Sequence, residues 1–183
     1  WVTAEYSMLP GSSPQRVTRE ASKGKQSGRT QEIQRLIGRS LRGVVDLTLM
    51  PGISISLDCD VLQADGGTRT ASITGCYVAL HDCFTRLIQA NILSAMPLVE
   101  QCAALSVGIV DGLVVADLDY IEDSSAHVDM NIVMSNDRFV EVQGTAEGMA
   151  FSKSELDDLL EIATQGIKQI MVKQNEILSE PPE

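Results

Sequence analysis

The sequence predicts an α+β fold in which long helices pack against a mixed or antiparallel sheet. Short segments that alternate apolar and polar residues recur along the chain, as expected for strands with one covered face. Turn signals such as Asp111-Gly112 join neighbouring segments, which favours antiparallel pairing. Longer segments repeat apolar residues at helical spacing and predict helices that cover the sheet.

The 183-residue chain is long enough to bury a sizeable core, and its apolar fraction of 44% is ordinary for a globular protein. No apolar run reaches the length of a transmembrane helix, and no signal-peptide pattern opens the chain. Its four cysteines lack metal-ligand spacing, so we expect buried, reduced thiols in a cytoplasmic protein. These observations predict a single domain over residues 1–183 without membrane contact.

Charge is distributed unevenly along the chain, although the net charge is −11. Residues 1–45 hold eight lysines and arginines against three acidic residues. Residues 10–28 are polar and basic without apolar periodicity, so we expect a mobile arm there. An acidic body with a basic arm predicts a polyanion at one edge, and solvated charge without a partner is the alternative.

The first half of the chain reads as strand, arm, helix, strand and helix. Residues 1–6 and 53–61 alternate as strands do, and residues 29–47 carry an apolar stripe that predicts a helix. Arg29 lies at the start of that helix, where a cation is unfavourable unless an anion shares the site. A second, long helix is predicted from the apolar stripe between Ile73 and Ile88. Small residues on its early turns predict close packing against a strand: Ala71, Ser72, Gly75 and Ala79.

A glycine-rich turn lies between the second strand and the second helix. The paired glycines Gly66 and Gly67 allow a close approach of the backbone. A turn that leads into a helix presents free N–H groups to an anion. Thr68 adds a hydroxyl, and Arg69 adds a guanidinium suited to phosphate. The turn is therefore predicted to bind an inorganic or terminal phosphate.

The second half of the chain is rich in predicted strands. These cover residues 102–110, 113–116, 128–134 and 139–144. Ser152 and Glu155 have the spacing of a capping box and predict the start of a last helix. Residues 179–183 are expected to form a polar, frayed tail.

Acidic residues crowd the stretch before and within the strand at 128–134. Carboxylates this close together raise one another's pKa or need a cation, and an oxygen-only set suits Mg²⁺ or Mn²⁺. One carboxyl group kept protonated would instead serve as a general acid, and a solvated acidic loop is the plain alternative. The residues concerned are Asp117, Asp119, Glu122, Asp123 and Asp129.

A phosphate-binding turn, a basic arm and paired carboxylates together predict chemistry on a phosphodiester. They leave open whether water or phosphate is the nucleophile. With these motifs the chain resembles the bacterial ribonuclease PH family, and the resemblance is most specific over residues 57–75 and 142–148. It extends over nearly the whole chain through residues 1–10, 23–26, 28–37, 57–75, 106–112, 117–133 and 139–148.

The resemblance implies a phosphate-dependent 3′→5′ exoribonuclease, or tRNA nucleotidyltransferase, that trims the 3′ ends of tRNA precursors and releases nucleoside diphosphates. Inorganic phosphate is then the co-substrate and Mg²⁺ or Mn²⁺ the metal. The family fold resembles the second domain of ribosomal protein S5, and the family assembles as a hexamer of three dimers. By resemblance, Arg29, Gly67, Thr68 and Arg69 bind phosphate. Asp123 and Asp129 are catalytic and hold the metal, with Asp129 as general acid, and Arg16 and Arg19 hold tRNA.

Two departures from the family pattern affect these expectations. Gly11 stands where the family has an arginine after Met-Leu-Pro, which predicts weaker RNA binding. Family members also begin upstream of Trp1, so strands of the same sheet are expected to be missing here. The alternatives are therefore a catalytically inactive RNA-binding ring subunit, a truncated form, or a core domain of polynucleotide phosphorylase.

Overall fold

The computed structural model describes residues 1–180 as an α+β fold. Its strands are β1 (Val2–Met8), β2 (Ile55–Val61), β3 (Cys102–Val110), β4 (Leu113–Ala116), β5 (Val128–Ser135) and β6 (Arg138–Ala146). Its helices are α1 (Gly28–Arg42), α2 (Thr68–Gln89), α3 (Tyr120–Ser125) and α4 (Lys153–Leu178), with 3-10 helices η1 (Glu20–Lys23) and η2 (Leu47–Leu49). The predicted fold class is confirmed.

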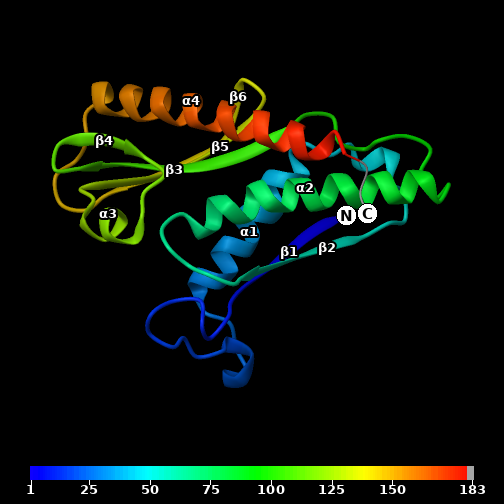
Figure 1. The fold of residues 1–183 in the computed structure, drawn as a ribbon, viewed down its shortest axis with the longest axis horizontal. Helices are drawn as coiled ribbons and strands as arrows, with labels where there is room; N and C mark the ends of the chain where they lie inside the picture. Colours follow the sequence, from blue (N-terminus) through cyan, green and yellow to red (C-terminus); the bar gives the residue numbers. More distant parts are fainter. Residues whose placement is uncertain (181–183) are drawn as a thin grey trace.

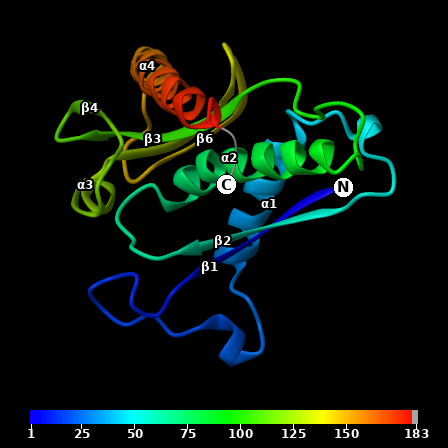
Figure 2. The same ribbon diagram turned by 45° about the vertical axis from the view of Figure 1, so that its right-hand side comes forward.

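Helices and sheets alternate in layers (Figure 1). Strands β4, β3, β5 and β6 form an antiparallel sheet in that order, and β1 pairs in parallel with β2. Helix α4 lies along one face of the four-stranded sheet, while α2 lies along the other, as the turned view in Figure 2 also shows. Helix α1 packs on β1 and α2, so α1 and α2 form a layer between the two sheets.

Two apolar clusters fill the spaces between these layers. One joins β1, β2, α1 and α2 to the near face of the four-stranded sheet, and the other lies between that sheet and α4. Strand β3 serves both, because Cys102 and Ala104 face the first cluster while Ala103 and Leu105 face the second. A strand covered on both faces needs apolar residues at most positions, which explains why β3 is largely apolar and why even its Ser106 is buried.

Several local predictions are confirmed. The hairpin between β3 and β4 turns through Asp111 and Gly112, whose φ angles of 50° and 79° are those of a two-residue turn. Helix α4 begins with a reciprocal capping box, in which the N–H of Glu155 donates to Ser152 and the N–H of Ser152 donates to Glu155. Within residues 1–180, no helix is long and apolar enough to cross a membrane.

The predicted end of the first helix was wrong, and one short helix was not predicted. Helix α1 ends at Arg42 instead of residue 47, since the chain turns at Gly43 and Asp46 caps η2 by accepting from the N–H of Thr48 at 2.9 Å. The acidic segment contains the unpredicted helix α3, so its plain alternative, a solvated loop, does not describe it. Its capping box of Asp119 and Glu122 is a local signal that the sequence already carried.

Three of the four small residues of α2 do not pack against a strand as predicted, whereas Ser72 interacts with Cys59 of β2. Ala71, Gly75 and Ala79 are exposed, and no atom would lie within 4 Å of a Cβ added at Gly75. Residues 181–183 of the predicted tail lie outside the described residues, while Ser179 and Glu180 close α4 through backbone hydrogen bonds. The mobility of the arm and the single-domain organisation remain predictions.

Candidate active site

The turn that precedes α2 leaves the start of this helix open. Gly67 occupies the N-cap with a φ of 68°, a left-handed conformation that favours glycine, and it offers no side chain to cap the helix. The Thr70 hydroxyl donates back to the carbonyl of Gly67 at 2.8 Å and holds the turn in shape. The first N–H groups of α2 are therefore available to an anion.

The same turn lies directly against the segment that leads into α3. The N–H of Tyr120 donates to the Asp65 carboxylate at 2.6 Å. A Cβ at Gly66 would lie only 1.9 Å from the carbonyl oxygen of Leu118, so only glycine fits. This backbone contact brings the predicted phosphate site next to the acidic segment.

Thr68 is held by a partner that the sequence did not reveal. Its hydroxyl lies 2.8 Å from the hydroxyl of Tyr6, a buried residue of β1. The alternating pattern of β1 placed Tyr6 on the covered face, but a pattern within one strand says nothing of a contact across 62 residues. Tyr6 therefore links the first residue of α2 to β1.

Arg29 and Arg69 occupy equivalent positions in two helices, because each is the second residue of its helix, α1 and α2 respectively. Each guanidinium thus starts from the positive end of a helix dipole, where a cation is unfavourable without a nearby anion. Both arginines act on the same acid, since each lowers the pKa of Asp129. The structure therefore gathers two cations and two helix N-termini around one place.

Asp129 is the second residue of β5, an inner strand of the four-stranded sheet, and lies opposite Gly108 of β3 and Thr145 of β6. Burial raises the pKa of Asp129 above its ordinary value, and the charge of Asp123 raises it further. Arg69 and Arg29 oppose this rise but do not cancel it. The predicted pair of aspartates and the predicted pair of arginines therefore converge, and Asp129 is the carboxyl group best suited to carry a proton.

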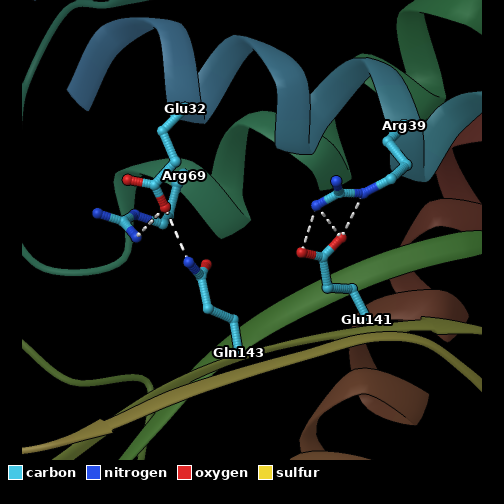
Figure 3. Close-up of polar contacts among 5 residues, drawn as sticks. All are labelled: Glu32, Arg39, Arg69, Glu141 and Gln143. Carbon is cyan, nitrogen blue, oxygen red and sulfur yellow. Dashed lines mark hydrogen bonds and ion pairs between the residues drawn. The ribbon is translucent and has the colours of Figure 1, made fainter. Parts of the chain in front are cut away.

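A second set of polar side chains connects α1 to β6 near Arg69 (Figure 3). The Glu32 carboxylate lies 3.7 Å from the guanidinium of Arg69 and accepts a hydrogen bond of 2.8 Å from the Gln143 amide. Further along α1, Arg39 makes a double contact with Glu141 at 2.5–2.9 Å. Sequence reasoning missed Glu32 and Gln143, which lie 111 residues apart.

The predicted RNA-binding arginines lie away from this centre. Arg16 and Arg19 are exposed on the loop between β1 and α1, which protrudes from the body in Figure 1. A cleft of about 880 Å³ lies between the arm and the strands β1 and β2, and Arg29 is among its lining residues. No contact between the two arginines and the aspartates is seen in residues 1–180, so their role stays a prediction.

Asp123 and Asp129 are the carboxylates that the sequence predicts as metal ligands. Across residues 1–180 no group of three or more histidine, cysteine or acidic side chains is arranged to hold an ion. Two carboxylates nevertheless fit Mg²⁺, which takes one or two from a protein and completes its shell with water and substrate phosphates. Burial and then the charge of Asp123 raise the pKa of Asp129, and a divalent cation would relieve the repulsion between the two carboxylates.

The fold and this convergence of charges define an α+β protein equipped for chemistry on phosphate esters. Two family models match the chain: domain 1 of the 3′ exoribonuclease family over residues 1–85 and domain 2 over residues 101–166. The chain is also 59% identical over 179 residues to a protein named ribonuclease PH from Syntrophomonas wolfei, covering 97% of this chain and 75% of that relative.

A solved structure supports the fold independently of close sequence similarity. The crystal structure of rice (Oryza sativa) Rrp46 superposes with a TM-score of 0.74 at 17% identity, over 98% of this chain and 73% of the rice chain. The chain therefore belongs to the ribonuclease PH (3′ exoribonuclease) family, as its sequence motifs predicted.

The contact at Gly66 can be tested by adding one methyl group. We expect Gly66→Ala to lower the free energy of unfolding by about 1–3 kcal/mol, because its Cβ would overlap the Leu118 carbonyl. Gly75→Ala is the matched control in α2, where open space and better helix propensity predict a gain of about 0.5–1 kcal/mol. Urea unfolding measures both, and equal effects of the two substitutions would contradict the proposed close contact.

Asp129 should make stability depend on pH. Its pKa is raised in the folded state, so its favourable contribution is complete below the ordinary pKa of 3.8 and is lost as pH rises through the raised value. We therefore expect Asp129→Asn to match the wild type in acid and to be more stable at neutral pH. Urea titrations without divalent ions measure this difference, and a less stable variant at neutral pH would overturn the assignment.

Proposed function

We propose that this protein is a phosphate-dependent 3′→5′ exoribonuclease that trims the 3′ ends of tRNA precursors. Membership of the ribonuclease PH family supports this activity. The observation that carries the proposal is the convergence of Arg29, Arg69 and Asp123 on Asp129, beside the open start of α2. One anion and one proton donor can therefore meet at a single place.

The anion is proposed to be free phosphate acting as the nucleophile. Phosphate must be held against its own repulsion from the scissile phosphodiester, and two guanidinium groups with a helix N-terminus provide that stabilisation. Gly67 and Thr68 would contribute the backbone N–H groups and the hydroxyl, with Thr68 oriented by Tyr6. A phosphate oxygen attacks the terminal phosphorus, the bond to the 3′-oxygen breaks, and a nucleoside diphosphate leaves.

The departing 3′-oxygen needs a proton or a positive charge. Asp129 is the proposed general acid, because its raised pKa keeps a proton available to higher pH than an ordinary aspartate does. Asp123 and Asp129 are also the proposed ligands of Mg²⁺ or Mn²⁺, which would neutralise charge on the phosphates. A carboxylate oxygen cannot hold the ion and a proton together, so the pH profile at several metal concentrations separates the two roles.

RNA is proposed to reach the site along the basic arm. Arg16 and Arg19 would contact the tRNA backbone, and the exposure of both arginines leaves them accessible to it. The arm carries Gly11 where the family has an arginine, so affinity for RNA should depend strongly on the remaining arginines. We further propose a cytoplasmic location, which agrees with the four free cysteines.

The activity is tested by incubating the protein with a 3′-extended tRNA, inorganic phosphate and Mg²⁺. We expect release of nucleoside diphosphates, and a loss of about a hundredfold or more in kcat/KM for Arg69→Ala or Asp129→Ala. Arg39→Ala is the control, because it also removes an arginine, but one that pairs with Glu141 and lies outside the proposed site. Release of nucleoside monophosphates, or activity independent of phosphate, would contradict the proposal.

Assembly is proposed to be a hexamer of three dimers, following the family. Sedimentation velocity should then report a particle of six 19.8 kDa chains. A monomer at micromolar concentration would contradict this assembly. RNA binding by the intact ring without any turnover would instead favour the inactive ring subunit.

A further inference from the structure

The charge and the conformation of the Arg69 side chain are not stabilised by its own helix. Arg69 lies at the positive end of α2, where the dipole repels a guanidinium, and its long side chain loses considerable rotamer freedom when it is fixed. Its side chain is nonetheless only 18% exposed. A neighbouring group must therefore compensate the charge and restrict the conformations of this side chain before any anion arrives.

Glu32 is the group placed to do this (Figure 3). Its Oε1 lies 3.7 Å from Nη1 of Arg69. At this distance the two charges attract each other, but the atoms are too far apart for a hydrogen bond. The carboxylate therefore attracts the guanidinium without occupying its N–H donors. Those donors remain free for phosphate, which a tight double contact like that of Arg39 and Glu141 would prevent.

Gln143 fixes Glu32 in turn. Its Nε2 donates to the same Oε1 at 2.8 Å, and its own Oε1 is buried without a hydrogen-bond partner among the described residues. Because Gln143 lies on β6 opposite Asn131 of β5, two residues from the pair of Asp129 and Thr145, it links Glu32 to the part of the sheet that carries the acid. Gln143 belongs to the run 142–148, over which the resemblance to the family is most specific, and its contact with Glu32 gives this residue of the run a physical role.

We propose that Glu32, anchored by Gln143, is a positioning residue that holds the Arg69 guanidinium ready for phosphate. The proposal builds on the phosphorolytic activity proposed above. Phosphate then binds to a cation that is already oriented, so part of the ordering cost is met before binding. Neither Glu32 nor Gln143 contacts the reacting atoms in this account, and both act through Arg69.

The test compares Glu32→Gln with Glu141→Gln in the full chain. Both substitutions weaken a polar link between α1 and β6, but only Glu32 lies beside Arg69. For Glu32→Gln we expect the KM for phosphate to rise about threefold to fivefold, the size of a partly exposed ion pair. The KM for RNA and kcat should stay unchanged, and Glu141→Gln should leave all three at wild-type values.

The reverse reaction and a second variant provide further checks. Attacking phosphate becomes the terminal phosphate of the released diphosphate, so Glu32→Gln should raise the KM for nucleoside diphosphates in RNA synthesis by a similar factor. Gln143→Ala should shift both constants in the same direction, because Glu32 loses its anchor. An unchanged or lower KM for phosphate in Glu32→Gln, or an equal rise in Glu141→Gln, would overturn the inference.

A binding measurement separates this inference from the proposed function. Inorganic phosphate should raise the thermal unfolding midpoint of the wild type and of Glu141→Gln, and the rise should be smaller for Glu32→Gln. This readout needs no turnover. A wild type that releases no diphosphate refutes the function alone, whereas equal thermal shifts in all three proteins refute the role of Glu32.

Discussion

The contact between Gly66 and the backbone at Leu118 is the constraint on which the site depends. The turn between β2 and α2, together with the first turn of α2, carries phosphate-binding groups. The acidic groups lie on α3 and β5. The two parts meet only because Gly66 has no side chain that would stand between them. The Asp65 carboxylate secures the contact through the N–H of Tyr120. A shift at this junction would separate Arg69 from Asp129, because each belongs to a rigid element on its own side.

The contact brings together positive groups that favour an anion and acidic groups that favour a cation or a proton. Arg29 and Arg69 stand at helix N-termini that favour an anion, and Asp129 is pushed towards its neutral form by burial and by Asp123. Such opposed environments are typical of functional sites. A phosphate would satisfy the arginines, and a divalent ion or a proton would satisfy the aspartates, so the resting site is prepared for ligands of both signs. Glu32 fits this arrangement because it balances Arg69 without occupying it.

Features set by neighbouring residues could be predicted from the sequence. The hairpin at Asp111-Gly112, the capping box at Ser152 and the strand before the arm each follow from local spacing, and the family motifs predicted the site residues. The end of α1 was misjudged because the apolar stripe continues past Gly43, where backbone turning decides instead. The partners Tyr6–Thr68, Asp65–Tyr120 and Glu32–Gln143 lie 62, 55 and 111 residues apart, and tertiary packing alone brings them together.

In the proposed reaction, this site delivers a free phosphate to the terminal phosphodiester of RNA. Isotopic labelling tests it most directly, because the origin of one phosphorus atom distinguishes phosphate attack from water attack. With radiolabelled inorganic phosphate and unlabelled RNA, the account predicts that the label appears in the terminal phosphate of the released nucleoside diphosphates. Unlabelled nucleoside monophosphates as the product would contradict it.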